Sequence, residues 1–341
     1  MNPPAAAPAS TFDLQEVLVD LLAAMPAESL GTPLDLRYWE AALLDPARDI
    51  LRRPGKGFRS QLVASSWALA GGTPGQQPQE LQFLVELLHA GSLVIDDIED
   101  ASETRRGEPS LHRRFGLPLA LNTGNWLHFL PLALLSRLGL QRDLALALYA
   151  DIADAVVLSH QGQALDLSLR VTSLRQSEVP AFVAQVTQLK TGALLRLAAL
   201  MGARAAGAAP ETLTALAHFG TRVGFVLQMA DDWSGIAVDR RRNKGFEDLQ
   251  LGRPTWPWAW LAESRDPVGY AGIARAAELA AAAPEVEEVL LRLRAQLHQT
   301  APGLIAATMQ EALHELVRVL GPSPALDDLA EQVQRLSQAY G

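Results

Sequence analysis

Three aspartates stand close together where an apolar run ends. Asp96, Asp97 and Asp100 occupy positions i, i+1 and i+4, so on a helix they lie within about one quadrant of its surface. Carboxylates this close repel one another unless a cation holds them, and hard oxygen ligands suit Mg²⁺, which also binds substrate phosphates. The pattern is typical either of a solvated helix terminus or of a site for a metal-bound polyphosphate.

Two arginines follow these aspartates. Arg105 and Arg106 come within two helical turns or one loop of Asp100. A guanidinium group donates to phosphate oxygens as a fork, which a lysine ammonium cannot do. The arginines either neutralise the aspartates in a surface ion-pair network or bind a phosphate held by the same metal. The second interpretation places acid, metal, phosphate and arginine in one site.

A second acidic pair, Asp231 and Asp232, follows another apolar helical run, with Gln228 one turn earlier. Metal sites in helical bundles are commonly built from facing helices, so we expect the two acidic elements to clamp one diphosphate between them. Further positive charge for two diphosphate groups is available at Lys56, Arg59 and Lys190. Each of these residues taken alone is more often an ordinary surface residue.

The elements that must position these groups are helical. Helical periodicity dominates from about position 12 onward, with few β-branched runs and no sustained period-2 alternation. Short Pro/Gly clusters predict turns, and none is long enough to separate two domains. We therefore predict an all-α fold, a single-domain bundle of about ten helices over residues 12–341, preceded by a disordered Ala/Pro-rich tail over residues 1–11.

The composition excludes several classes of function. The 341 residues carry a net charge of −9 without a Lys/Arg-rich block, which argues against nucleic-acid binding because a phosphate backbone needs a concentrated basic surface. The absence of Cys excludes disulfides and thiolate catalysis, and fits a reducing compartment. The amino terminus lacks the basic start of a secretory signal, and Gly or Pro and Arg interrupt the most apolar stretches. We predict a cytoplasmic protein without a transmembrane segment.

Seven motifs occur in a fixed order between Leu51 and Trp260. They read PGKGFR, LLHAGSLVIDDIEDASETRRGEPSLH, NTGNW, GQALDL, KTGALLRL, LQMADDW and NKGFEDLQLGRPTWP. In this order and at this spacing the chain resembles the trans-isoprenyl diphosphate synthases, and within them the geranylgeranyl diphosphate synthases of eukaryotic type. The resemblance implies the isoprenoid synthase fold, in which helices surround a central apolar cavity.

The resemblance also implies a role for each matching residue. About three Mg²⁺ ions on an allylic diphosphate would be held by Asp96, Asp97, Asp100, Asp231 and Asp232. The same diphosphate would be contacted by Arg105, Lys190 and Lys244. A pocket for isopentenyl diphosphate would contain Lys56, Arg59, His89 and Arg106. Dipoles facing a developing carbocation would come from Thr191 and Gln228.

The implied reaction needs no side-chain nucleophile. Metal ions and cationic side chains stabilise a leaving diphosphate, an allylic carbocation forms in an apolar cavity, and the isopentenyl double bond attacks it. Proton loss to the departing diphosphate completes one elongation. This chemistry agrees with the absence of a convincing Ser/His/Asp or Cys/His arrangement in the sequence. The resemblance further implies a homodimer or an assembly of dimers.

Two positions depart from the family's pattern. The second acidic motif usually ends in a third carboxylate, but Gly235 stands there, and we expect Asp248 or water to contribute in its place. Asn125 stands where many relatives have Asp, as the eukaryotic-type pattern allows. A tryptophan cluster, interpreted as packing residues instead of a cofactor site, consists of Trp256, Trp258 and Trp260.

The length of the product should depend on what lines the cavity beneath Asp96. Gly91 and Ser92, one turn earlier, are small and permit a chain longer than farnesyl. Trp126 and His128 on the following helix are expected to form its floor. We therefore predict a linear geranylgeranyl product, made from isopentenyl diphosphate and a dimethylallyl, geranyl or farnesyl starter.

Two other functions fit the same motifs in part. A terpene cyclase on this fold would keep the metal-binding motifs but would need no isopentenyl diphosphate, so the retained Lys56, Arg59, His89 and Arg106 argue against it. A non-catalytic subunit that modulates a prenyltransferase would be expected to lose its first acidic motif, which this chain keeps.

Overall fold

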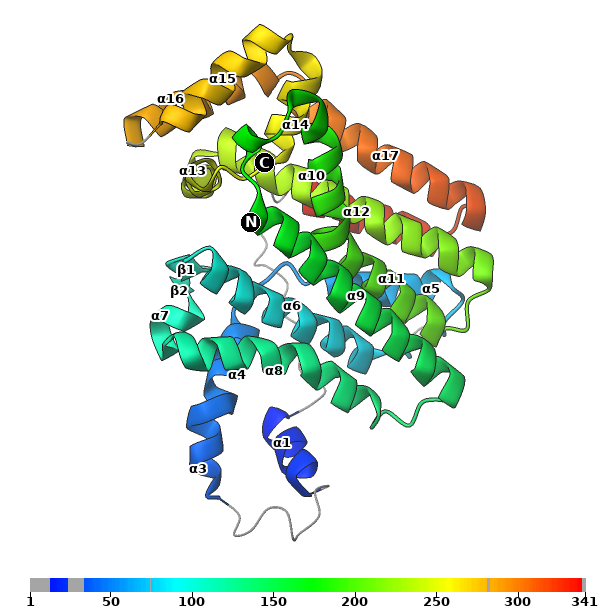
Figure 1. Ribbon diagram of the computed structural model, residues 1–341. Helices are drawn as coiled ribbons and strands as arrows, with labels where there is room; N and C mark the ends of the chain where they lie inside the picture. The colour runs from blue at the N-terminus through cyan, green and yellow to red at the C-terminus, as the bar shows by residue number, and fades with distance from the viewer. Residues whose placement is uncertain (1–12, 24–33, 74, 281–282, 339–341) are drawn as a thin grey trace. The chain divides into compact units, whose positions relative to one another are not determined.

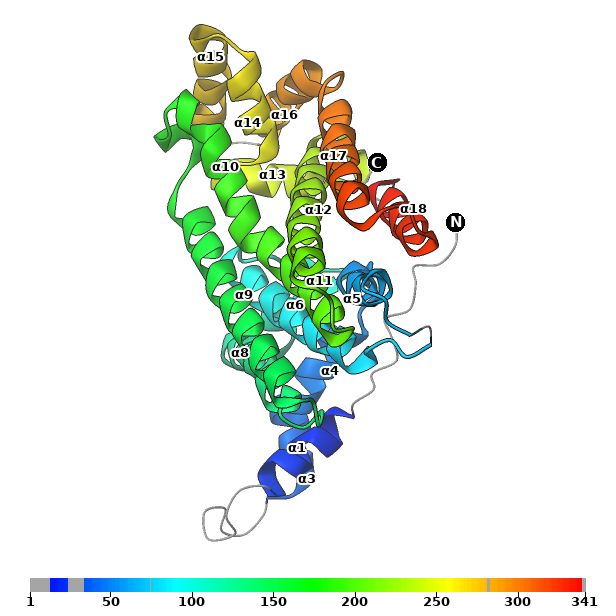
Figure 2. The same cartoon turned by 90° about the vertical axis from the view of Figure 1, so that its right-hand side faces the viewer.

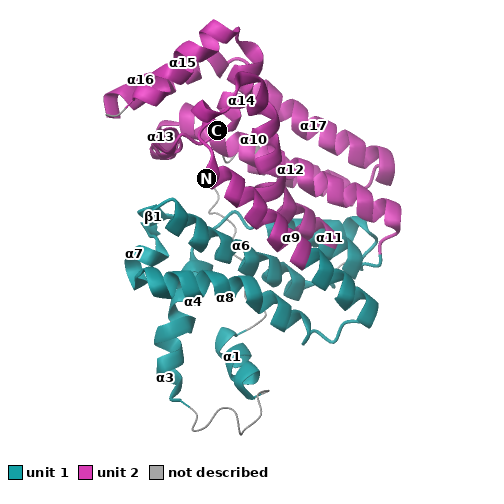
Figure 3. Ribbon diagram, viewed as in Figure 1, with its two compact units in different colours: residues 1–152, 201–207 teal, residues 153–200, 208–341 magenta. Residues whose placement is uncertain are grey.

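The computed structural model describes residues 13–23, 34–73, 75–280 and 283–338. The chain forms two compact units (Figure 3). Unit 1 comprises residues 1–152 and 201–207, and unit 2 comprises residues 153–200 and 208–341. The tail predicted over residues 1–11 lies outside the described residues, and the single-domain organisation stays a prediction.

Helices make up almost all of the described chain, so the predicted all-α class is confirmed. Helical segments outnumber the ten or so expected because several are a single turn or two long, such as α3 (Leu36–Trp39) and α7 (Leu111–Phe115). Among the described residues the strands are β1 (Thr104–Arg105) and β2 (Glu108–Pro109), which form one antiparallel hairpin. Within the same residues, no helix combines the length and the apolar character needed to cross a bilayer.

Unit 1 carries the first acidic motif. Besides α3, α7 and the hairpin, it contains α1 (Leu14–Ala23), the π-helical turn η1 (Glu40–Leu44), α4 (Asp45–Arg52), α5 (Phe58–Leu69), α6 (Gln79–Glu99), α8 (Leu117–Leu135), the first part of α9 (Arg142–Ser168) and the last residues of α11 (Ala193–Ala205).

The centre of unit 1 is the packing of α6 against α8 (Figure 1). The two helices approach closely because each has a glycine at the crossing. A Cβ on Gly91 would lie 2.8 Å from the carbonyl oxygen of Gly124, and a Cβ on Gly124 would lie 2.8 Å from the Cδ1 of Ile95. Such distances are too short for any side chain. This contact fixes the carboxyl end of α6, where the three aspartates stand.

Unit 2 carries the second acidic motif. It contains the rest of α9 and α11, the 3₁₀ turns η2 (Val171–Ser173), η3 (Gln176–Glu178) and η5 (Asp239–Arg241), the π-helical turn η4 (Gln188–Gly192), and the helices α10 (Val179–Thr187), α12 (Pro210–Ala237), α13 (Arg242–Leu251), α14 (Trp256–Ser264), α15 (Pro267–Leu279), α16 (Ala283–Leu297), α17 (Ala301–Leu320) and α18 (Pro324–Gln338).

The long helix α12 is the axis of unit 2, and α17 runs along it in both views (Figure 1 and Figure 2). The helix α14 also packs against α12, and its three tryptophans are buried. The rings of Trp256 and Trp260 lie 6.0 Å apart, and those of Trp258 and Tyr270 lie 6.2 Å apart. The packing role predicted for these tryptophans is confirmed.

A π-helical turn interrupts the helix between α10 and α11 and carries Lys190 and Thr191. Neighbouring helices reach this turn only because they present glycines to it. A Cβ on Gly162 of α9 would lie 2.5 Å from the Lys190 backbone nitrogen, and a Cβ on Gly224 of α12 would lie 2.6 Å from the Cα of Gly192. Such π turns frequently occur at functional sites. The turn sets the direction of both side chains.

Candidate functional site

The first carboxylate cluster forms at the carboxyl end of α6, as the spacing predicts. The helix runs to Glu99, and Asp100 caps it with its backbone nitrogen donating to the carbonyl oxygen of Asp96 at 2.9 Å. Asp97 is almost completely buried, with 1% of its surface exposed, whereas Asp96 and Asp100 are half-buried. The three carboxylates therefore differ in their environment although they share one helix end.

Arg105 on β1 neutralises two of these carboxylates. Its Nε donates to the Oδ1 of Asp97 at 2.7 Å, and its Nη2 donates to the same oxygen. The same Nη2 lies 3.4 Å from the Oδ2 of Asp96. Arg105 and the aspartates thus lie together, as both interpretations of the sequence require. A guanidinium so placed also lies where it can donate to an anion that binds beside the aspartates.

The second oxygen of Asp97 fits a metal ligand. Burial raises the pKa of Asp97, as does the Asp96 charge, and the Arg105 hydrogen bond opposes both. Among the described residues, the buried Oδ2 of Asp97 accepts no hydrogen bond. A buried acceptor without a donor is costly, so this atom suits a cation. The described residues contain no group of three or more His, Asp or Glu that could hold a metal alone, but Mg²⁺ commonly takes a few carboxylates together with substrate phosphates.

Arg59 and His89 also come together in unit 1. The Nη1 of Arg59 on α5 lies 3.1 Å from the Nε2 of His89 on α6. Removal from water lowers the pKa of His89 well below its usual 6.5, and the charges of Arg59, Arg106 and Arg105 lower it further. His89 is therefore neutral at neutral pH and accepts a hydrogen bond from Arg59 through Nε2. The two residues predicted for one substrate pocket are thus in contact.

Arg106 follows Arg105 in the hairpin turn and lies against the loop that carries Lys56. A Cβ on Gly55 would lie 2.9 Å from the Nη2 of Arg106, so the guanidinium covers this glycine. Removal from water lowers the pKa of Arg106, the Arg105 and Arg53 cations lower it further, and Glu86 opposes them. Lys56 itself is exposed. The PGKG loop and the second arginine thus share one surface of unit 1.

The residues predicted to control product length lie where α6 and α8 cross. The Oγ of Ser92 donates to the carbonyl oxygen of Leu88 at 3.0 Å and lies 3.2 Å from the Nε2 of His128. His128 is buried and Trp126 is half-buried. Gly91 has a packing reason for its small size, the close approach to α8, and this reason is independent of any product. The floor made by Trp126 and His128 stays a prediction.

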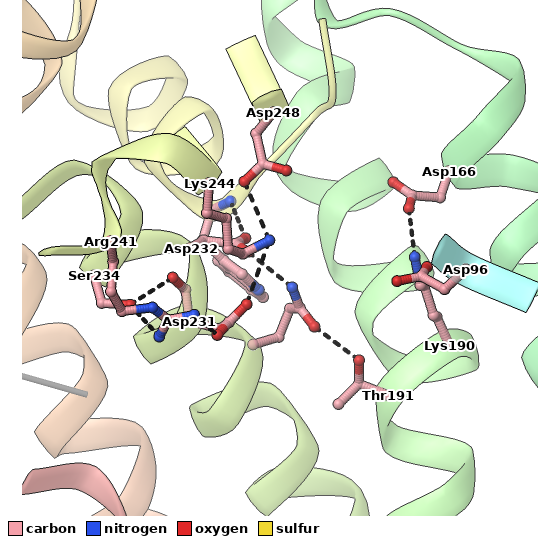
Figure 4. A network of polar contacts seen from close by, with 12 residues as sticks. Asp96, Asp166, Lys190, Thr191, Asp231, Asp232, Ser234, Arg241, Lys244 and Asp248 are labelled. Carbon is pink, nitrogen blue, oxygen red and sulfur yellow. Dashed lines mark hydrogen bonds and ion pairs between the residues drawn. The ribbon is translucent and has the colours of Figure 1, made fainter. Parts of the chain in front are cut away.

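In unit 2, Asp231 accepts from two cations (Figure 4). The Nη2 of Arg241 donates to its Oδ1 at 2.5 Å, and the Nζ of Lys244 lies 3.4 Å from its Oδ2. Burial would raise the pKa of Asp231, but Lys244 and Arg241 outweigh burial and lower it. Asp231 is therefore ionised, and its charge suits a cation ligand.

The missing third carboxylate of the second motif has a packing explanation. A Cβ on Gly235 would lie 3.2 Å from the backbone nitrogen of Gly245, and a Cβ on Gly245 would lie 2.4 Å from the carbonyl oxygen of Gly235. The paired glycines let α13 lie directly on α12. Lys244 then reaches Asp231, and its Nζ lies 3.3 Å from the Oδ2 of Asp248 (Figure 4).

Asp248 thereby comes beside the second acidic pair, where the sequence analysis expected a substitute ligand. Burial raises the pKa of Asp248, and the Lys244 charge opposes this rise. Two carboxylates, Asp231 and Asp248, share the ammonium of Lys244. Whether Asp248 replaces the absent carboxylate as a metal ligand stays a prediction.

Asp232 has a different environment from Asp231. Its Oδ1 accepts from the Nε2 of Gln228 at 2.8 Å, and its Oδ2 accepts from the backbone nitrogen of Trp256 at 3.0 Å. Burial raises the pKa of Asp232 to about 7, and the Asp248 and Asp231 charges add to the rise. The Oγ1 of Thr191 donates to the Oε1 of Gln228 at 2.8 Å, which completes a chain of polar groups from η4 to α14 (Figure 4).

Two residues of this site were not singled out from the sequence. Arg241 contacts Asp231 and also donates to the Oγ of Ser234 at 2.7 Å. Asp166 accepts from the Nζ of Lys190 at 2.8 Å. Asp166 lies within the motif GQALDL, so that motif held the signal, whereas Arg241 lies in an arginine run whose register only the fold reveals.

A family model described as Polyprenyl synthetase matches residues 40–289 of this chain. Among curated proteins, the chain is similar to a geranylgeranyl pyrophosphate synthase from Eremothecium gossypii, with 33% identity over 252 residues that cover 71% of this chain and 77% of the relative. It is also similar to one from Dictyostelium discoideum, with 31% identity over 229 residues that cover 66% and 70%. The predicted resemblance to synthases of eukaryotic type is confirmed.

Solved structures share the fold. A geranylgeranyl pyrophosphate synthetase from Pyrococcus horikoshii Ot3 superimposes with a TM-score of 0.73 at 23% identity, covering 89% of this chain and 92% of the other. A geranylgeranyl pyrophosphate synthase from Corynebacterium glutamicum, complexed with isoprenyl diphosphate and magnesium, has a TM-score of 0.73 at 20% identity, covering 95% and 97%. This chain has two aspartate motifs with basic partners, and the family model matches most of its length. It therefore belongs to the polyprenyl synthetase family.

Proposed function

We propose that this protein is a trans-prenyltransferase that condenses isopentenyl diphosphate with an allylic diphosphate to give geranylgeranyl diphosphate. The observation that carries the proposal is the pair of carboxylate sites, each at the end of an apolar helical run and each in contact with Arg or Lys side chains. The similarity to synthases named for this product supports the product assignment.

We infer that divalent cations, Mg²⁺ in the first place, bind the allylic diphosphate at these carboxylates. The ligands would be Asp96, Asp97, Asp100, Asp231 and Asp232, and about three ions would be bound with the diphosphate. The buried, unsatisfied Oδ2 of Asp97 supports the first part of this site. Bound metal would act as a Lewis acid on the leaving diphosphate.

The protein's own cations would act on the same charge. Arg105, Lys190 and Lys244 would donate to the allylic diphosphate as negative charge develops on its bridging oxygen. Arg105 and Lys244 already stand beside carboxylates of the two motifs, so they would shift their donors from carboxylate to phosphate when the substrate binds. Preorganised cations of this kind stabilise the ionised state without further reorganisation.

The second substrate must be held without being ionised. Lys56, Arg59, His89 and Arg106 would bind isopentenyl diphosphate, and they lie on the PGKG loop, on α5 and α6 and in the hairpin turn of unit 1. His89 is neutral, so the net charge of this pocket comes from Lys56 and the two arginines. The hydroxyl of Thr191 and the amide of Gln228 would face the carbocation, and diphosphate oxygen would accept the proton that elongation releases.

Product analysis tests this proposal. The pure protein would be incubated with Mg²⁺, labelled isopentenyl diphosphate and, separately, dimethylallyl, geranyl or farnesyl diphosphate, and the products separated by chromatography. We expect a linear product of geranylgeranyl length. Turnover of an allylic substrate without isopentenyl diphosphate would instead identify a terpene cyclase, and inertness with every mixture would identify a modulatory subunit.

We further propose that two copies of the chain associate through α8. This helix exposes Leu117, Leu121 and Phe129, and Phe129 has 66% of its surface exposed. Large apolar side chains gathered on one exposed helix are typical of an interface between subunits. The resemblance to a family of homodimers favours a second copy as the occupant, and a cytoplasmic location remains part of the proposal.

A further inference from the structure

The hairpin that carries both arginines has an unfavourable turn. Strands β1 and β2 pair in the register Arg105↔Glu108, which leaves Arg106 and Gly107 as the two turn residues. Both have positive φ angles, 54° for Arg106 and 84° for Gly107. This pattern is that of a type I′ turn, in which Asn-Gly or Gly-Gly is preferred because a side chain with an ordinary Cβ fits poorly. Neighbouring structure must therefore hold Arg106 in place.

A buried arginine holds the backbone of this hairpin. Arg53, directly after α4, donates from Nη1 to the carbonyl oxygen of Arg105 at 3.0 Å and from Nη2 to the carbonyl oxygen of Pro109 at 2.8 Å. One guanidinium thus binds both strands. Only 3% of the Arg53 surface is exposed, so its donors are fixed in direction. The planar fork of an arginine suits this arrangement, and a lysine has no equivalent.

A buried aspartate in turn holds this arginine. Asp49, one turn earlier on α4, accepts at Oδ1 from the Nε of Arg53 at 2.9 Å and from its Nη2 at 2.6 Å. Its Oδ2 lies 2.7 Å from the Nη1 of Arg114 on α7, the helix that follows the hairpin. A single carboxylate, 3% exposed, therefore connects the arginines on both sides of the hairpin.

The hairpin in turn binds the segment that follows α4, through the side chain of Arg106. The Nη1 of Arg106 donates to the carbonyl oxygen of Arg53 at 3.1 Å, and its guanidinium covers Gly55. The side chain of Arg106 is thus seated on the loop after α4, and the backbone of Arg105 is held by Arg53. Both arginines of the hairpin therefore depend on the carboxyl end of α4 and the residues that follow it.

We propose that Asp49 and Arg53 are positioning residues of this enzyme. They act through Arg105 and Arg106, whose guanidinium groups they aim at the two diphosphate groups of the substrates. The inference rests on the proposed function and extends it, because neither residue is among those that we expect to touch a substrate, a metal or the reacting atoms. A salt bridge that only stabilised α4 would not need to bind both strands of the hairpin.

Substitution of Arg53 by Lys tests this role. Arg53→Lys keeps the charge opposite Asp49 but removes the fork, and we expect KM for isopentenyl diphosphate to rise about tenfold or more, since small misplacements of binding groups have large effects. Arg52→Lys is the matched control, because Arg52 lies 3.4 Å from the same Asp49 but is exposed, and among the described residues its side chain forms no hydrogen bond with the hairpin. Its kinetics should stay within about twofold of the wild type.

Two further variants keep the test independent of stability. Asp49→Asn in an Arg53→Lys background should add little to the rise in KM, because both residues act through one connection. Gly55→Ala leaves Asp49 and Arg53 intact but places a Cβ 2.9 Å from the Arg106 guanidinium, and it should raise KM in the same way. A fall in melting temperature with an unchanged KM in Arg53→Lys would overturn the proposal, whatever the result for Gly55→Ala.

The binding of inorganic pyrophosphate with Mg²⁺, measured by calorimetry, separates this inference from the proposed function. If the wild type makes no prenyl product but Arg53→Lys still weakens pyrophosphate binding about tenfold, the positioning role stands and the proposed reaction fails. If the wild type elongates its substrate and Arg53→Lys matches it in KM and in pyrophosphate affinity, the positioning role is wrong and the reaction stands.

Discussion

At the scale of single residues, identical side chains have different environments. Asp97 is buried with one oxygen unsatisfied among the described residues, whereas Asp232 is buried with both oxygens accepting hydrogen bonds. Asp231 accepts from two cations. The pKa of Asp232 is raised to about 7, whereas that of Asp231 is lowered. We therefore expect Asp97 and Asp231 to respond most strongly to metal, and Asp232 to contribute mainly through the contacts it makes.

Removal of the first carboxylates should abolish turnover. In Asp96→Ala and Asp97→Ala we expect kcat/KM to fall by about 100-fold or more, because charge stabilisation of the leaving diphosphate is lost. The fold should survive, since one of several repelling carboxylates is removed. Glu99→Ala is the control, because Glu99 is exposed on the same helical turn. Steady-state kinetics measure the loss of activity, and circular dichroism checks that the fold is intact. Unchanged activity in both aspartate variants would exclude the metal role.

The lowered pKa of His89 makes a prediction about pH. Because the folded-state pKa lies below the usual 6.5, the unfolded chain binds the proton more readily. The stability contribution of neutral His89 is therefore complete above pH 6.5 and is lost as the pH falls through the folded-state pKa. The His89→Gln protein should lose less stability than the wild type as the pH falls. Thermal unfolding without substrate measures this loss. Equal pH profiles for the wild type and His89→Gln would contradict the prediction.

At the scale of elements, close helix packing decides which charges meet. The paired glycines Gly235 and Gly245 let α13 lie on α12, and this contact brings Lys244 to Asp231 and Asp248. The π-helical turn η4 and the glycines that face it set Lys190 and Thr191 in the same way. The absent third carboxylate of the second motif is thus one part of a packing arrangement that supplies another carboxylate from α13.

A methyl group at this contact should be harmful. Gly245→Ala places a Cβ 2.4 Å from the carbonyl oxygen of Gly235, so α13 must move away from α12. We expect a loss of roughly 1–3 kcal/mol in the free energy of unfolding and a rise in KM for the allylic substrate. Denaturant unfolding and kinetics measure both quantities.

Gly272→Ala is the control for this substitution. Gly272 lies within α15 and a Cβ there meets nothing within 4 Å, so alanine should be neutral or slightly stabilising. If Gly245→Ala behaved like Gly272→Ala, the contact between the two glycines would not position α13.

At the scale of the whole molecule, the chain consists of two compact units and presents an apolar helix face on α8 of unit 1. Each unit contains one acidic motif with its own basic partners. Both motifs take part in the proposed reaction. The proposed second copy of the chain would cover α8.

A charge on α8 should prevent this association. We expect Phe129→Glu to shift the protein from a dimer to a monomer of 36.7 kDa, because a buried unpaired carboxylate in the interface is costly. Light scattering after gel filtration measures the mass. Val268→Glu is the control, since Val268 is also exposed but lies on α15 of unit 2. A wild-type mass of 36.7 kDa, or a dimeric Phe129→Glu protein, would contradict the proposed interface.

The sequence by itself determined the helical class and the family, and it predicted most charged groups of the candidate site. Periodicity and motif order carry this information locally, because they are properties of residues close together in the sequence and do not depend on the tertiary fold. The contact of Arg105 with the aspartates and the packing role of the tryptophans of α14 followed from the same reasoning.

The tertiary structure alone decided the partners of each charge. Asp49 and Arg53 appear in the sequence as ordinary members of a short charged helix, and only the fold shows that they are buried and bind the hairpin between α6 and α7. Likewise, Gly235 appears as a missing ligand until Gly245 is seen to pack on it. Burial and contacts between distant segments arise from packing, which depends on the whole chain, whereas helical periodicity depends on neighbours within a few residues.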